Sequence, residues 1–429
     1  MNPILKVAFT ANLFEWYEFS LTAFMALEIG RLFFPATDDK AALMLSFTVF
    51  ASSYLARPVG SVFFGYFSHR RGTGSALRWS MVGMAVPAAL ISFLPTYESI
   101  GSVATALLLG LKIIQGFCAG GELPLTGYFV SLNTPRKYRG IYCAVSVASG
   151  FFGMLLASGV VLALPHAASL LSPYTSMGPA KFVPDAWRWP FLICIPLSVF
   201  VYLTRTSMND GQRRRKRALP RQRPVAPLLQ AFSLVAFMEI VIYSLFVWMP
   251  AYLHAYLGVS KSDAGTTNTI ALLAFSASMI GAGYLARFVD ATVLVFSGVS
   301  LISVACAPLF IALQNASLLA LISVQVAFGI LASCVVGVIF VVLPDLFRDN
   351  WGSFGMVVTY SVATAMFGGT APIVCAYLIS ATQVLIAPAL YILATGMVAT
   401  PVACSLMRRR GRWPTASNGD ILTPTLETR

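Results

Sequence analysis

The sequence predicts an all-α membrane protein with twelve transmembrane helices, arranged as two pseudo-symmetric bundles of six. Three observations support this fold class. The 429 residues are 58% hydrophobic and only 10% charged, whereas a soluble domain carries about a quarter charged residues to solvate its surface. Long apolar runs follow one another along the whole chain. Lys and Arg are concentrated in alternate connections between these runs.

Each predicted helix is an apolar run long enough to cross a bilayer, which takes about twenty residues. The runs are 4–33, 42–67, 77–95, 101–131, 140–164, 188–206, 227–256, 265–288, 291–313, 317–343, 353–380 and 384–406. The first run contains Glu15 and Glu18 and lacks a small-residue cleavage site. We therefore interpret it as a retained helix and not as a signal peptide.

The distribution of basic residues predicts the orientation of these helices. Clusters of Lys and Arg occur in every second connection, and the opposite connections are nearly uncharged or mixed in charge. The basic positions are 70–78, 136–139, 213–217, 287, 348 and 408–410. Basic loops stay on the cytoplasmic side of a membrane. We therefore expect both termini in the cytoplasm, with the chain in a bacterial inner (cytoplasmic) membrane.

A long polar segment divides the apolar runs into two groups of six. The expected units are an N-terminal bundle at 1–206, a basic cytoplasmic linker at 207–226, a C-terminal bundle at 227–410 and a disordered tail at 411–429. Two six-helix halves are typical of transporters whose site lies between the halves, near the membrane midplane. The linker contains the run Arg213 to Arg217, which we expect to contact anionic lipid.

Composition and motifs exclude several other classes. The net charge of +13 lies in short connections without the interleaved aromatics of a nucleic-acid-binding surface, so no nucleic-acid partner is predicted. The seven cysteines and three histidines lack metal-ligand spacing, and we expect no metal, cofactor or disulfide framework. No Walker motif or nucleophile–base pair occurs, which argues against an ATP-driven pump and against an enzyme.

Charged side chains within the apolar runs are the first candidates for a site, because a charge at membrane depth is costly unless it is paired or hydrated. Glu15 and Glu18 are three residues apart in the first run and so share one helix face. Two carboxylates this close disfavour each other's ionisation, which suits proton coupling. The alternative is that one of them pairs with a cation only to hold helices together.

The fourth run carries a polar stripe that cannot face lipid. Lys112, Gln115 and Glu122 lie on one helix face. Lys112 suits an anionic substrate or a carboxylate of the first run, Gln115 is a candidate substrate contact, and Glu122 is a candidate proton carrier. A purely structural ion pair is the alternative for the two charged residues.

Arg57 lies about three turns before the cytoplasmic end of the second run, which is too deep for its side chain to reach water easily. Its guanidinium would hold a carboxylate through two hydrogen bonds, and substrate binding and an interhelical clamp both remain open. In the second half the ionisable candidates reduce to Glu239. Tyr243 and Tyr360 lie away from the helix ends, so we interpret them as candidate substrate contacts, with packing as the alternative.

Several short motifs occur in order along the chain. They are Asn12 with Glu15-Trp-Tyr-Glu-Phe19, Phe33-Phe-Pro35, Arg57-Pro58 with Gly60, Phe63-Phe-Gly65, Gln115-Gly-Phe117, Gly120-Gly-Glu122, Pro135 with Arg139-Gly140, Trp187-Arg-Trp-Pro-Phe191 and Phe367-Gly-Gly-Thr-Ala-Pro372. With these motifs the chain resembles the metabolite:proton symporter family of the major facilitator superfamily. That family includes proline/betaine, α-ketoglutarate, citrate and shikimate transporters. The resemblance covers essentially the whole membrane region.

The resemblance implies proton-coupled uptake of a small molecule by alternating access, with Lys112 and Arg57 in or near the substrate path. Our leading interpretation is import of a small carboxylate-bearing metabolite by a monomer. A zwitterionic osmolyte such as betaine or proline is the alternative, and aromatic caging by Trp16, Tyr17 or Tyr243 would favour it. Export and a non-transporting receptor also remain open.

The connection after the second run departs from the superfamily pattern. Within Gly65-Tyr-Phe-Ser-His-Arg-Arg-Gly72, His69 takes the place of an Asp that normally helps to hold the two halves together, and Arg70 follows it. The counterpart after the eighth run has Arg287. We predict that Gly65, His69, Arg70, Gly72 and Arg287 form a gating region that differs from the usual one. Two further departures are Glu18 in place of Asp and Ser361 in place of Asn.

Overall fold

A computed structural model describes residues 3–10, 12–35, 39–171, 186–206, 225–314, 316–347 and 351–409. The expected C-terminal tail and most of the expected linker, including the basic run Arg213 to Arg217, lie outside the described residues. The regular elements of the described part are all helical.

The first bundle contains the helices that precede the linker. They are α1 (Pro3–Thr10), α2 (Leu13–Phe24), α3 (Ala26–Phe33), α4 (Asp39–Arg71), α5 (Thr73–Ser92), α6 (Tyr97–Ile100), α7 (Ser102–Ala119), α8 (Glu122–Asn133), α9 (Arg136–Leu171), α11 (Arg188–Leu192) and α12 (Cys194–Thr206).

The second bundle contains the helices that follow the linker, and two of its spans include a π-helical turn. Its elements are α13 (Val225–Ile242), η2 (Tyr243–Val247), α14 (Met249–Ala255), α15 (Lys261–Leu285), α16 (Ala291–Ala312), α17 (Leu318–Val336), α18 (Ile339–Leu346), α19 (Gly352–Ala363), η3 (Thr364–Gly368), α20 (Ala371–Thr382) and α21 (Ala387–Arg409). Because α13 begins at Val225, the last two residues of the expected linker are helical.

The twelve expected spans all correspond to helical segments. Nine segments in the described part of the chain are long and apolar enough to cross a membrane. The other three spans are α1–α3, α4 and α11–α12. Breaks at Asn12 and Met25 divide the first span, and a break at Ile193 divides the sixth.

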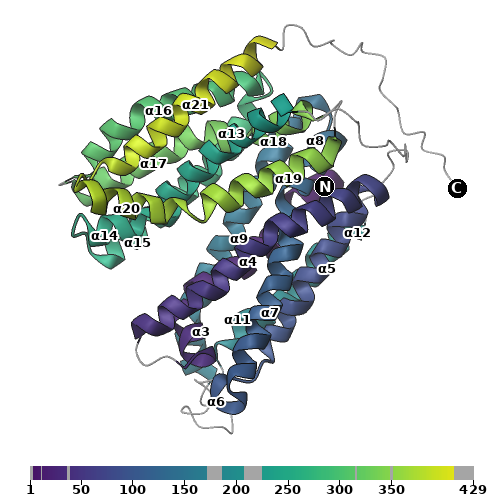
Figure 1. The fold of residues 1–429 in the computed structure, drawn as a ribbon, viewed down its shortest axis with the longest axis vertical. Helices are drawn as coiled ribbons and strands as arrows, with labels where there is room; N and C mark the ends of the chain where they lie inside the picture. Colours follow the sequence, from purple (N-terminus) through teal and green to yellow (C-terminus); the bar gives the residue numbers. More distant parts are fainter. Residues whose placement is uncertain are drawn as a thin grey trace, which may run out of the picture.

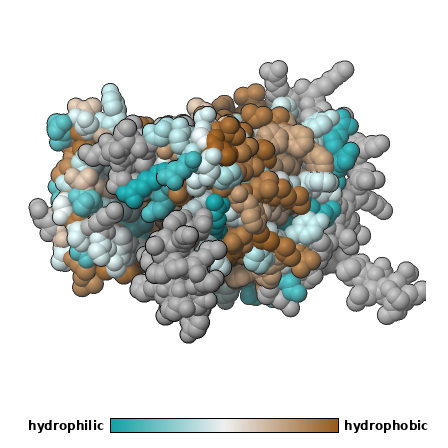
Figure 2. Space-filling view, turned by 90° about the horizontal axis from the view of Figure 1, so that it is seen from below, coloured by the Kyte–Doolittle hydropathy of each residue, from teal (hydrophilic) through white to brown (hydrophobic). Residues whose placement is uncertain are grey.

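Side chains on the outside of the bundles are those of a lipid-facing surface. Leu55, Val304 and Leu319 are each more than 70% exposed. Figure 2 shows a broad brown area of apolar side chains beside hydrophilic ones in teal. In water such exposed apolar side chains would drive association between protein molecules. In a bilayer they contact the lipid chains, which solvate the surface of a transmembrane helix.

The two bundles are separate in Figure 1, with the first drawn from purple to blue and the second from teal to yellow. They converge where α8, α18 and α19 lie, near the N-terminus. Ser68 at the end of α4 donates a hydrogen bond to Ser353 at the start of α19, with 3.2 Å between the hydroxyl oxygens. This is the end of the molecule at which the basic connections occur.

Candidate functional site

A pocket between the bundles is lined by side chains from both of them. The first bundle contributes Glu15, Trp16, Arg57, Gly120, Val147 and Phe151, and the second contributes Met238, Glu239, Tyr243, Phe340, Tyr360, Ser361 and Thr364, among others. The wall is therefore apolar and aromatic with a few charged groups, as in most small-molecule sites.

Several helices are interrupted at the level of this pocket. Gly120 separates α7 from α8, and its carbonyl accepts a hydrogen bond from the Ser361 hydroxyl of the other bundle. The π-helical turns η2 and η3 begin at Tyr243 and Thr364, and both residues line the pocket. Such interruptions are common at functional sites because they redirect side chains and free backbone groups.

Arg57 enters the pocket from α4 and meets Glu15 of α2. The Arg57 Nη2 to Glu15 Oε1 distance is 3.3 Å, and the guanidinium also lies over the rings of Tyr54 and Phe19, at 4.6 Å and 5.2 Å from their centroids. Arg57 Nε and Glu15 Oε2 are buried but make no hydrogen bond. Both ends of this ion pair therefore have unused hydrogen-bonding capacity inside the pocket.

Glu239 enters the pocket from α13, opposite this pair. Its Oε1 accepts a hydrogen bond from the Thr364 hydroxyl at 2.8 Å, and Tyr360 lines the pocket with it. The residue is only 4% exposed. Within the described part of the chain no Lys or Arg forms an ion pair with Glu239.

A pair of tyrosines joins the two bundles beside the pocket. The hydroxyls of Tyr54 in α4 and Tyr243 in η2 are hydrogen-bonded to each other. Sequence analysis did not single out Tyr54, although its position three residues before Arg57 places it on the same face of the helix.

Three residues predicted to contact substrate lie outside the pocket lining. Lys112 donates hydrogen bonds to the Glu18 carboxylate and the Thr22 hydroxyl of α2. Gln115 donates to the Met84 carbonyl at 3.4 Å, and Tyr17 donates to the Pro190 carbonyl at 2.9 Å. For the Lys112–Glu18 pair, this geometry favours the alternative of a structural ion pair.

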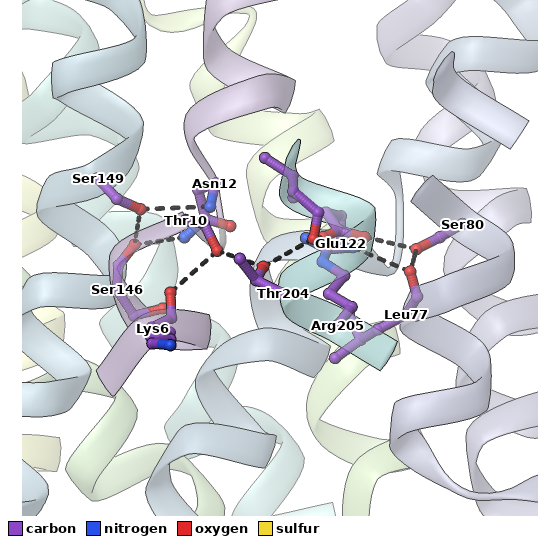
Figure 3. Close-up of polar contacts among 11 residues, drawn as sticks. Lys6, Thr10, Asn12, Leu77, Ser80, Glu122, Ser146, Ser149, Thr204 and Arg205 are labelled. Atoms are coloured by element: carbon purple, nitrogen blue, oxygen red, sulfur yellow. Dashed lines mark hydrogen bonds and ion pairs between the residues drawn. The ribbon is translucent and has the colours of Figure 1, made fainter. Parts of the chain in front are cut away.

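Glu122 is also paired within the first bundle. Its carboxylate accepts hydrogen bonds from Arg205 of α12 and from Ser80 of α5, and Arg205 also donates to the Leu77 carbonyl at 2.9 Å (Figure 3). Arg205 is 1% exposed. Its position gave no sign of this role, because an arginine at the end of the sixth run is expected to orient the chain and not to lie in its interior.

The predicted gating residues lie in the last two turns of α4 or just after α4 and α15, and most of their described contacts are local. Arg70 donates to the Tyr66 hydroxyl at 2.9 Å, and Arg287 lies over the Phe288 ring, 5.6 Å from its centroid. His69 is in the last turn of α4, and Gly72, with a φ of 98°, joins α4 to α5. Gly65 faces the other bundle, because an added Cβ would lie 3.2 Å from the Phe354 ring.

An ion pair that sequence analysis did not foresee joins the two bundles near this region. Arg139 donates to both carboxylate oxygens of Asp345, at 3.0 Å and 3.1 Å, and also to the Val341 carbonyl. The pair connects the start of α9 to α18. Arg139 belonged to a recognised motif, but nothing in the sequence linked it to Asp345.

Comparison with known proteins identifies the family. A model described as Major Facilitator Superfamily matches residues 8–369. The ectoine/proline transporter ProP of Corynebacterium glutamicum is 27% identical, covering 100% of this chain and 87% of the relative. The citrate-proton symporter of Klebsiella pneumoniae is 28% identical, covering 95% of this chain and 92% of the relative.

Solved structures show the same fold. The proton:xylose symporter XylE superposes with a TM-score of 0.70 at 16% identity, over 95% of both chains. The Escherichia coli fucose:proton symporter FucP gives a TM-score of 0.66 at 16% identity, over 95% of this chain and 99% of that one. The chain belongs to the major facilitator superfamily, among its metabolite:proton symporter-like members, and is a multi-pass membrane transporter and not an enzyme.

Proposed function

We propose that this transporter couples the uptake of a small carboxylate-bearing metabolite to the inward movement of protons, by alternating access of the central pocket. The membrane is a bacterial inner membrane, with both termini in the cytoplasm. The single observation that carries the proposal is Arg57, a forked cation that lines the pocket with its Nε unused.

A substrate carboxylate is the natural partner of this guanidinium. Arg57 holds Glu15 through one contact of 3.3 Å, whereas a bound carboxylate could engage Nε and Nη2 together. Two parallel charge-assisted hydrogen bonds are stronger and more directional than one. The substrate therefore competes with Glu15 for Arg57.

This competition gives a reason for proton coupling. Once Arg57 is engaged by substrate, Glu15 would be an unpaired carboxylate that is 4% exposed. A buried charge without a partner is strongly unfavourable, and a proton removes it. Of the three carboxylates expected to couple protons, Glu15 is the one that lines the pocket, while Glu18 and Glu122 pair with Lys112 and Arg205.

More narrowly, we propose that the carboxylate-bearing substrate is a zwitterion. Among the described residues that line the pocket, Arg57 is the only cationic side chain, so a substrate with several carboxylates would lack further partners. Trp16 and Tyr243 line the pocket and offer ring faces to a quaternary or secondary ammonium. Relatives named as ectoine/proline and proline/betaine transporters support this choice. Relatives named as a citrate-proton symporter and an alpha-ketoglutarate permease support the organic-acid alternative.

The test is uptake by purified protein in proteoliposomes, with and without an imposed inward proton gradient. The labelled panel contains proline, betaine and ectoine on one side and citrate and α-ketoglutarate on the other. We expect gradient-dependent accumulation of a zwitterion. Accumulation of only the di- and tricarboxylates would show that the substrate is an organic acid and not a zwitterion. Equal uptake with and without the proton gradient would contradict the proposed coupling.

A further inference from the structure

The three buried carboxylates described in the first bundle each have a basic partner. Glu15 pairs with Arg57, Glu18 with Lys112, and Glu122 with Arg205. Protonating Glu18 or Glu122 would leave a buried cation without its counter-charge, which is strongly unfavourable. These two pairs are therefore poor places to load and unload a proton in every transport cycle.

Glu239 in the second bundle has a different set of partners. Its described hydrogen bond comes from the Thr364 hydroxyl at 2.8 Å, and the neighbouring groups of the pocket wall include the tyrosines Tyr243 and Tyr360. A hydroxyl can donate to a carboxylate and can accept from a carboxylic acid. Glu239 can therefore gain or lose a proton without stranding a charge on a neighbour.

The space around Glu239 suits a carboxyl that is alternately charged and neutral. Its second oxygen, Oε2, lies beside Gly368, where an added Cβ would be 3.3 Å away. The titratable and charged groups nearby are Arg57 and Tyr54 of α4, Tyr243 of η2 and Tyr360 of α19. Arg57 alone among them is a cation, and it is paired with Glu15.

We propose that Glu239 carries one of the co-transported protons, on the opposite side of the pocket from the arginine that binds the substrate carboxylate. When the pocket opens to the outside, a proton from water bonds to a carboxylate oxygen of Glu239. The closed pocket favours the neutral acid, because an ionised carboxylate without a cation is costly away from water. When the pocket opens to the cytoplasm, the O–H bond breaks and water there takes the proton.

This inference rests on the proposed function, and the experiment separates the two. Substrate accumulation at static head is measured in proteoliposomes over a series of imposed proton gradients, and the slope gives the number of protons moved per substrate. For E239Q we expect this number to fall by one while gradient-independent exchange of substrate continues. E98Q, a carboxylate-to-amide change at an exposed position in α6, is the matched control and should keep the wild-type slope.

The outcomes are distinguishable. A wild-type slope of zero would overturn the proposed function itself. A wild-type slope above zero that E239Q leaves unchanged would overturn only the role of Glu239. Loss of exchange as well as driven uptake in a correctly inserted E239Q protein would also overturn it, because Glu239 would then be needed for binding or packing.

A second measurement on the unaltered protein avoids any dependence on a variant. Apolar carbodiimides react with protonated carboxyl groups, and the modified residue is located by peptide mass spectrometry. We expect Glu239 to be modified at neutral pH, while Glu18 and Glu122 remain unmodified in their ion pairs. Modification of Glu18 or Glu122 with none at Glu239 would contradict the proposal.

Discussion

The two bundles differ in the partners of their buried polar side chains. In the first bundle, ion pairs join α2 to α4, α2 to α7 and α8 to α12. Ser80 of α5 also bonds to Glu122, and Asn12 at the start of α2 donates to the Ser146 carbonyl of α9 at 2.6 Å (Figure 3). All six spans of the first bundle are thus connected by buried polar contacts.

In the second bundle the described buried contacts are mostly between neutral groups. Asn268 of α15 donates to the Phe246 carbonyl, and Ser244 of η2 bonds to the Cys375 thiol of α20. Glu239 accepts a hydrogen bond from the Thr364 hydroxyl, and two π-helical turns interrupt the helices around it. From this difference we expect the first bundle to move as one rigid body, and we propose that the second holds the carboxyl whose charge changes.

The largest expected effect comes from breaking an ion pair of the first bundle. E122Q removes the charge that balances Arg205, a residue that is 1% exposed. Removing one partner of a buried pair costs about 3–5 kcal/mol, so we expect a marked loss of folded protein on thermal or denaturant unfolding in detergent. The double variant E122L/R205M removes both charges and should recover most of that loss.

The matched change in the second bundle sharpens the comparison. E239Q alters a similarly buried carboxyl that forms no ion pair with a described Lys or Arg, so we expect its unfolding free energy to stay within about 1.5 kcal/mol of wild type. Equal destabilisation by E122Q and E239Q would show that the two bundles do not differ in this respect. E98Q again serves as the control for the loss of an exposed carboxylate.

Replacing the forked cation of the pocket should have the next largest effect. R57K keeps the positive charge but cannot make two parallel hydrogen bonds to a carboxylate. The loss of one hydrogen bond to a charged group, about 1.5–3 kcal/mol, lowers kcat/KM for uptake by about 10- to 150-fold. Initial uptake rates over a range of substrate concentrations measure this.

A role of Arg57 in packing alone predicts a different result. In that case R57K would lower the amount of folded protein and leave kcat/KM per folded molecule unchanged. R78K, an Arg-to-Lys change in α5 outside the pocket lining, is the matched control and should transport like the wild type.

The smallest expected effect is at the contact between the bundles. The side chains of Arg139 and Asp345 are 16% and 25% exposed. We therefore expect D345N, which weakens the pair, to destabilise the conformation that contains it by only about 1 kcal/mol. That cost shifts the balance between conformations that are closed and open at this end of the molecule about fivefold. Distances between spin labels at the start of α9 and the end of α18 report this shift. The charge reversal R139D/D345R should restore the wild-type distribution, and unchanged distances in D345N would show that the pair does not hold the bundles together.

Several features of the candidate site were predictable from particular residues. Arg57 was conspicuous because it lies too deep to reach water. The fourth run, by contrast, was expected to be one helix, and only the structure shows that it is divided at Gly120. The partners were not predictable. Lys112 was expected to meet either a substrate or a carboxylate of the first run, and only the structure shows that it pairs with Glu18, 94 residues away in sequence. The same holds for Arg205 and Glu122, which are 83 residues apart.

The sequence by itself determined the fold class and the positions of the helical spans, and it predicts their orientation and their division into two bundles. Those properties depend on hydropathy and charge summed along each run, because a bilayer requires about twenty apolar residues per span and retains basic loops on one side. Only the tertiary structure decided which charged groups are paired within a bundle and which face the pocket. Pairing depends on distances between helices that are remote in sequence, and a one-turn difference in packing moves a side chain from a partner to the pocket.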